Sequence, residues 1–83
     1  MPIAISGKAL AELLLKDGWQ IERRANHGFL MWKVFPGEST RRTTIVPDKS
    51  EDLADKVLGV ILGVKQTQIG RKGLQELIDR YGR

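Results

Sequence analysis

The sequence predicts an α+β domain in which one helix is followed by three antiparallel strands and then by two more helices. Three observations carry this prediction. Apolar residues recur at three- and four-residue spacing in three segments, which is typical of amphipathic helices. Between the first two of these segments, apolar and polar residues alternate, which is typical of half-buried strands. Short stretches of turn-forming residues separate the strands, so neighbouring strands are expected to pair antiparallel.

The first helix is expected over about residues 7–17, where leucines recur at helical spacing. Ser6 is a natural N-cap, because its hydroxyl can accept a hydrogen bond from the first backbone N–H groups of a helix. Gly18 is a natural stop at the C-terminal end. The apolar stripe of this helix consists of Leu10, Leu13 and Leu14.

Three strands follow, and they are expected at about residues 19–24, 29–35 and 41–46. The first two are joined by Ala25-Asn26-His27-Gly28, in which Asn and Gly accept the positive φ angles of a tight reversal. A second turn over residues 36–40 leads to the third strand, and Pro47 ends that strand. The three strands are therefore expected to form an antiparallel meander.

Two further helices are expected after the sheet. The second helix should begin at Asp48, because Glu51 three residues later completes a typical N-capping pattern, and it should end near Gly63. Its apolar stripe consists of Leu53, Val57, Leu58, Ile61 and Leu62. The third helix is expected over residues 71–81, with Gly82 as its stop. The first two helices should cover the apolar face of the sheet and leave the other face open, where arginines would gather.

Length and composition restrict the class of protein. A chain of 83 residues is expected to form a single domain, residues 1–83. The absence of cysteine excludes disulfides, thiolate nucleophiles and Cys-based zinc sites. No apolar run is long enough to span a membrane and no secretory signal is present, so a cytoplasmic location is expected. The single histidine has no partner at metal-ligand spacing, so neither a metal nor a cofactor is expected.

Positive charge is concentrated over residues 20–47, within a net charge of +4. Its basic residues are Arg23, Arg24, Lys33, Arg41 and Arg42. Only Glu22 and Glu38 oppose them in this region. Such a distribution favours an anionic partner, either a nucleic acid or an acidic protein surface, although a solvated face without a partner fits equally well. Among the aromatic residues, Trp19 and Tyr81 are expected in the core, whereas Trp32 fits either the core or a surface that stacks bases.

His27 is the only histidine in the chain and falls in the predicted turn between the first two strands. It is either a tolerated turn residue or a proton-transfer group. The second interpretation is favoured by Arg23 and Arg24, which could bind phosphate beside it. An imidazole in this position could deprotonate the 2′-hydroxyl of RNA and direct it at the neighbouring phosphate, a reaction that requires neither metal nor cysteine.

Several short motifs, taken in order, resemble the HicA (YcfA-like) mRNA interferase toxins. They are Ser6-Gly7-Lys8-Ala9-Leu10, Asp17-Gly18-Trp19, Arg23-Arg24, Asn26-His27 and Ile45-Val46-Pro47. The resemblance covers a core of residues 5–62, and residues 66–83 form a C-terminal helical extension that the shortest members lack. It implies a fold similar to a double-stranded-RNA-binding domain, with one helix, a three-stranded antiparallel sheet and a second helix on the same face.

The resemblance also implies a function. The leading hypothesis is a metal-independent endoribonuclease that cleaves mRNA, the toxin of a type II toxin-antitoxin pair, neutralised by a HicB-like antitoxin protein. His27 would be the general base or acid. The RNA phosphates would be held by Arg23, Arg24, Lys33, Arg41 and Arg42.

Two departures from the family pattern motivate an alternative. Ala25-Asn26 stands where the family commonly has Gly-Ser before the histidine, and Trp32 stands where a second histidine often occurs. The alternative hypothesis is a non-catalytic RNA-binding module, or a degenerate toxin with the same fold. A third hypothesis makes the basic surface a docking site for an acidic protein, without RNA.

Overall fold

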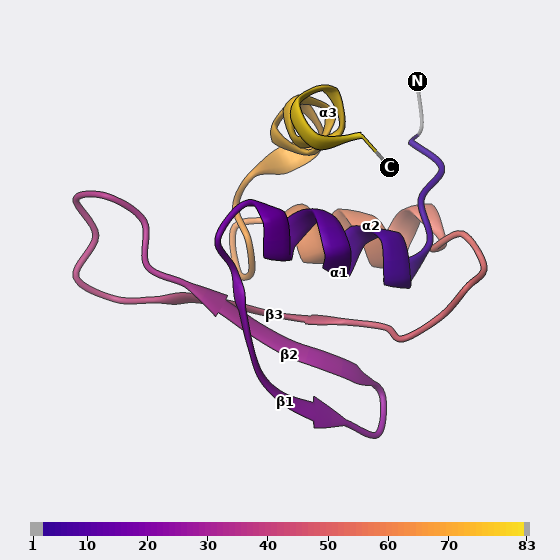
Figure 1. Ribbon diagram of the computed structural model, residues 1–83, viewed down its shortest axis with the longest axis horizontal. Coiled ribbons are helices and arrows are strands. Elements are labelled where there is room, and N and C mark those ends of the chain that lie inside the picture. Colours follow the sequence, from indigo (N-terminus) through magenta and orange to yellow (C-terminus); the bar gives the residue numbers. More distant parts are fainter. Residues whose placement is uncertain (1–2, 83) are drawn as a thin grey trace.

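The computed structural model describes residues 3–82, and these residues form three layers (Figure 1). The first layer is an antiparallel sheet with the strand order β1-β2-β3. Its strands are β1 (Gln20–Ala25), β2 (Gly28–Lys33) and β3 (Arg42–Val46). One face of the sheet is covered by α1 (Gly7–Lys16) and α2 (Asp55–Leu62), and α3 (Gly70–Tyr81) lies over these two helices, away from the sheet.

The predicted α+β architecture is therefore confirmed, with an N-terminal helix, three antiparallel strands and two further helices. The predicted C-terminal extension contains α3, and its last residue, Arg83, lies outside the described residues. Within residues 3–82, no helix combines the length and the apolar character that crossing a membrane would require.

Strand register decides which side chains reach the core. On the face toward the helices, Met31 pairs with Thr44 and Phe29 pairs with Val46. Met31, Thr44 and Val46 are all buried, whereas Ile45 on the opposite face is 49% exposed. The face that carries Ile45 is called the open face below. The core lies between the sheet and α1 and α2, as expected from the alternation of side chains along a strand.

The N-terminal helix forms as its sequence predicts. The Ser6 hydroxyl accepts a hydrogen bond from the backbone N–H of Ala9, which confirms Ser6 as the N-cap. Gly18 adopts φ +100° just after the helix ends, a conformation that glycine tolerates better than other residues. The leucines of the predicted stripe and Trp19 belong to the core, and Tyr81 is partly buried against it.

The predicted start of the second helix was wrong. α2 begins at Asp55 rather than near Asp48, and no side chain caps it. The Asp48 carboxylate is instead bound by Lys8 and Arg24. The chain before α2 runs along the N-terminal segment, where the N–H of Leu53 donates to the carbonyl of Ile5 over 2.8 Å. Long-range pairing has therefore replaced the local capping pattern.

The apolar stripe of α2 is also narrower than predicted. Leu58, Ile61 and Leu62 are buried, and Leu53 is partly buried before the helix. Val57 is 39% exposed. The helix thus presents Leu58, Ile61 and Leu62 to the core, and Val57 lies at the exposed edge of this stripe.

Two glycines allow the end of β3 to pack tightly between α1 and the β1–β2 hairpin. A Cβ at Gly7 would overlap the carbonyl oxygen of Pro47, and a Cβ at Gly28 would overlap the carbonyl oxygen of Val46. The N–H of Lys8 also donates to the carbonyl of Lys49 over 3.0 Å. The chain from Val46 to Lys49 is called the clamped segment below.

Gly28→Ala should destabilise the protein by more than Gly37→Ala. Both glycines have positive φ, +146° and +82°, so either substitution carries a backbone cost of roughly 1–2 kcal/mol. Only Gly28 meets a backbone atom, and the overlap should add about 1–3 kcal/mol, since nothing lies within 4 Å of a Cβ at Gly37. The measurement is the free energy of unfolding in denaturant. Equal losses in the two variants would contradict the packing described for the clamped segment.

Candidate functional site

His27 lies in the two-residue connection between β1 and β2. Ala25 pairs with Gly28, so Asn26 and His27 form the tip of the hairpin. Neither of these two residues has a positive φ, and it is Gly28, with φ +146°, that completes the reversal. The pairing on both sides of the turn and the contact of Gly28 with β3 hold the tip in place. The His27 side chain is exposed to solvent.

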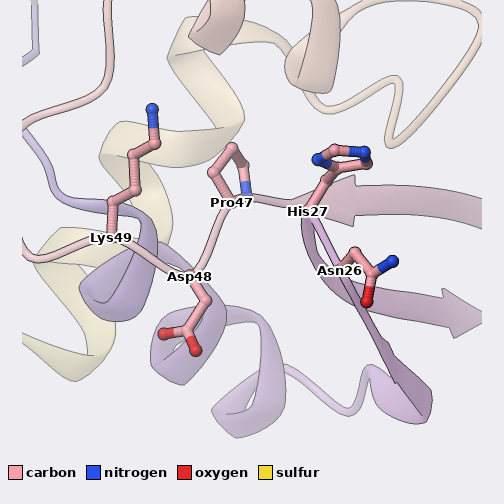
Figure 2. A pocket seen from close by; sticks show the side chains of 5 residues that line it. All are labelled: Asn26, His27, Pro47, Asp48 and Lys49. Carbon is pink, nitrogen blue, oxygen red and sulfur yellow. The ribbon is translucent and has the colours of Figure 1, made fainter.

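A surface hollow of about 340 Å³ lies beside the imidazole. It is lined by Asn26, His27, Pro47, Asp48 and Lys49 and is called the His27 hollow (Figure 2). Figure 2 shows the His27 ring and the Lys49 side chain on one side of the clamped segment, whereas the Asp48 carboxylate points to the other side. The imidazole therefore has an exposed ammonium group, not a carboxylate, on its own side of the chain.

The Asp48 carboxylate pairs with two cations next to the hollow, Lys8 and Arg24. Its carboxylate accepts hydrogen bonds from Lys8 Nζ over 2.7 Å and from Arg24 Nη2 over 2.5 Å. The bond from Lys8, followed by the bond from Arg24, lowers the pKa of Asp48 below its ordinary value of 3.8. The Arg24 guanidinium also lies 5.2 Å from the centre of the Phe29 ring, on the helix-covered side of the sheet. Arg24 is thus near His27 but already paired.

Arg23 and Arg24 project from opposite faces of the sheet because the register of β1 shifts between Ile21 and Arg23. The irregularity places Arg23 opposite Leu30, on the open face, and Arg24 opposite Phe29. Unbroken alternation would have put Arg23 on the same face as Ile21. Arg23 is exposed and forms no ion pair with any residue between positions 3 and 82.

Lys33 lies on the helix-covered face and holds the end of α1. Its ammonium donates to the carbonyl oxygen of Asp17 over 2.6 Å and pairs with the Asp17 carboxylate over 3.2 Å. It also lies 4.7 Å from the centre of the Phe35 ring. With only 21% of its side chain exposed, Lys33 has a packing role in this structure.

Arg42 lies on the same face as Lys33, and its guanidinium is 3.8 Å from the centre of the Phe35 ring. It pairs with Glu38 and donates to the carbonyl of Thr67 over 2.8 Å. The hydrogen bond from Arg42 lowers the pKa of Glu38 below its ordinary value of 4.5. Arg42 therefore connects the β2–β3 loop to the segment before α3, and its side chain is 17% exposed.

Arg41 belongs to the open face. Its guanidinium pairs with Glu22 over 2.8 Å and lies 5.2 Å from the centre of the Trp32 ring. The structure thus separates the five predicted RNA-binding cations into two sets. Arg23 and Arg41 are on the open face, whereas Arg24, Lys33 and Arg42 are on the helix-covered face.

Lys49 is the residue of the His27 hollow that sequence reasoning missed. It is exposed and forms no ion pair within the described part of the chain. A signal was present, because an antiparallel third strand of the expected length must end beside the turn that precedes the second strand. The residues after Val46, including Lys49, must therefore lie close to the turn that contains His27.

The described residues contain no group of three or more His, Asp or Glu side chains placed to hold a metal ion. Comparisons with known proteins show no significant similarity, because no protein-family model, no curated protein and no solved structure matches the chain. The geometry around His27 and the short motifs that resemble the HicA toxins are therefore the support for a functional proposal.

Stability should fall on acidification because Asp48 and Glu38 have lowered pKa values in the folded chain. As the pH drops below about 4.5, the unfolded chain takes up protons before the folded chain does, so the free energy of unfolding decreases. The contribution of both carboxylates is fully present at neutral pH. Asp48→Asn should make this decrease shallower, as measured by denaturant unfolding at a series of acidic pH values. Identical acid dependence in wild type and Asp48→Asn would contradict the Lys8–Asp48–Arg24 pairing.

Proposed function

We propose that the protein is a metal-independent endoribonuclease, the mRNA-cleaving toxin of a type II toxin-antitoxin pair acting in the cytoplasm. The observation that supports it most is the placement of the only histidine. His27 is exposed at a hairpin tip held by β3, and it lines a hollow together with Lys49, which forms no ion pair among residues 3–82. The resemblance of the short motifs to the HicA family supports the same proposal.

The proposed reaction is a transesterification within RNA. His27, as the free base, removes the proton from a 2′-hydroxyl, and the 2′-oxygen attacks the adjacent phosphorus. The bond to the 5′-oxygen of the next nucleotide breaks, leaving a 2′,3′-cyclic phosphate and a 5′-hydroxyl. Lys49 is placed to offset the negative charge that builds up on the phosphate oxygens.

The leaving 5′-oxygen needs a proton from a second source. Attacking and leaving oxygens lie roughly in line on opposite sides of the phosphorus. One imidazole therefore serves one of them in a single encounter, and the chain has no second histidine. Asp48 is engaged by Lys8 and Arg24 and is held in its ionised form. Water or Lys49 then supplies the proton to the leaving oxygen.

A protein partner belongs to the same proposal. A HicB-like antitoxin would cover the His27 hollow and so deny RNA access to the imidazole. An acidic surface suits this task, because the hollow is lined by Lys49, and Lys8 and Arg24 lie next to it at Asp48.

The second candidate function is RNA binding without cleavage. It is favoured by the described lining of the His27 hollow, which has no second histidine and whose one carboxylate, Asp48, is already paired with Lys8 and Arg24. In that case His27 and Lys49 would contact RNA without transferring protons. The two candidates predict the same surface but different products.

His27→Ala should lower the rate constant for RNA cleavage by about 10²- to 10⁴-fold, because a positioned general base contributes a factor of this size. Its affinity for RNA should be nearly unchanged. The measurement uses purified protein and RNA in EDTA, with quantification of 2′,3′-cyclic phosphate ends. Lys49→Gln is the matched variant from the same hollow, and it should chiefly weaken binding.

Cleavage by His27→Ala at the wild-type rate would remove the catalytic assignment. If the wild-type protein binds RNA but produces no cyclic phosphate ends, the second candidate is favoured.

RNA affinity should weaken steeply with salt, because neutralised phosphates release counterions. For a single strand, the slope of log K against log salt concentration is about 0.7 per phosphate contacted. Lys49→Gln should reduce the slope by about one such contact. Lys72→Gln, an exposed lysine on α3 remote from the sheet, should leave it unchanged. A slope that responds equally to both variants would contradict binding at the His27 hollow.

A further inference from the structure

The open face of the sheet carries an aromatic and aliphatic patch without a covering element. Leu30 and Trp32 of β2 and Ile45 of β3 form its centre, and Leu30 pairs directly with Ile45. In Figure 1, α1 and α2 lie on one side of the sheet, and none of the three helices covers the other side. Trp32, which fitted either the core or a stacking surface by sequence, therefore lies outside the helix-packed core.

The patch is surrounded by positive charge. The three strands contain a single acidic residue, Glu22, and it pairs with Arg41. Arg23 projects beside Leu30 and forms no ion pair with the residues that the structure describes. Lys65, which also has no ion pair among residues 3–82, lines a hollow of about 230 Å³ that includes Leu30 and Ile45. The open face thus suits a ligand that is anionic and also has apolar surfaces.

The size of the patch favours a nucleic acid strand over a protein. Three strands of about five residues span about 15 Å by 17 Å. That footprint, roughly 250 Å², is well below the roughly 800 Å² per partner of a standard protein interface. It is sufficient for a short single-stranded segment, since such strands bind by stacking bases on aromatic rings beside cations, and Trp32 is partly exposed.

The patch lies along β2, the strand that begins directly after His27. Side-chain alternation places Gly28, Leu30 and Trp32 along one face of β2, and His27 immediately precedes Gly28. Trp32 therefore lies about 17 Å from the hairpin tip along the strand. Arg23, opposite Leu30, lies between the two. An RNA strand that presents a phosphate to His27 can continue across Arg23 to Trp32.

We propose that the open face binds the single-stranded RNA segment next to the cleaved bond, with a base stacked on Trp32 and a phosphate held by Arg23. Arg41 keeps the indole in place and adds positive charge beside the ring. The inference takes its substrate class from the proposed function and extends it, because it assigns a stacking site remote from the proton-transfer group.

Tryptophan fluorescence tests the stacking directly on the wild-type chain. The chain has two tryptophans, and Trp19 is only 2% exposed, so RNA can reach Trp32 alone. A 2′-O-methyl oligoribonucleotide of about eight nucleotides is a suitable probe, because it has no free 2′-hydroxyl and stays intact. It should quench the emission in a saturable way, and Trp32→Phe should abolish the quenching while retaining much of the affinity.

Substitution gives the energetic test. Trp32→Ala should weaken binding of the same probe by about 10- to 100-fold, the loss expected for one base stack. Arg23→Gln should weaken it and reduce the salt slope. Val60→Ala is the control, because Val60 is 54% exposed on α2. Circular dichroism of each variant checks that the fold is kept.

Binding of the probe without quenching, or unchanged affinity in Trp32→Ala, would overturn the stacking site. Such a result would leave cleavage at His27 intact. Conversely, if His27→Ala cleaves RNA at the wild-type rate, the nuclease mechanism is removed. Quenching by the probe would then still support the binding face. The failures of the two proposals are therefore distinguishable.

Discussion

The close packing of the clamped segment between two glycines is the constraint on which the candidate site depends. Gly7 at the start of α1 and Gly28 at the start of β2 each leave room only for a backbone carbonyl of this segment. Three parts of the chain that are distant in sequence thereby meet at one point. His27 and Lys49 line the same hollow because His27 directly precedes Gly28 and Lys49 belongs to the clamped segment. The hollow is a consequence of backbone packing, and its side chains are free to interact with a ligand.

The same junction explains why a capping pattern in the sequence did not start a helix. Asp48 followed by Glu51 is a frequent N-terminal signal, and local propensity alone favoured a helix there. In the folded chain Asp48 faces Lys8 and Arg24, and the following residues pair with the N-terminal segment through Leu53 and Ile5. A pattern read from neighbouring residues in the sequence does not predict non-local contacts of this kind. Helix α2 starts only where that pairing ends, at Asp55.

Much of the fold could nevertheless be predicted, because most elements depend on local patterns. The leucine stripe with Ser6 predicted α1, and the alternation around the Asn26-His27 turn predicted the hairpin. The site was less predictable, because two-fold alternation fails at the irregularity between Ile21 and Arg23. That shift changes the face of Arg23, and no feature of the residues on either side announces it. The sequence therefore predicts the strands, but it does not predict which face of the sheet each side chain occupies.

The ion pairs show which of the predicted cations are most readily available to bind phosphate. Lys33 and Arg42 are mostly buried, stack on Phe35 and bond to backbone carbonyls, so moving them to a ligand would break several contacts at once. Arg24 and Arg41 are exposed by 69% and 46%, and exposed pairs contribute little to stability. A backbone phosphate, which carries the same single negative charge as a carboxylate, can therefore compete with their carboxylate partners. Arg23 and Lys49 form no ion pair within residues 3–82 and need no such exchange, which makes these two cations the first contacts of an approaching strand.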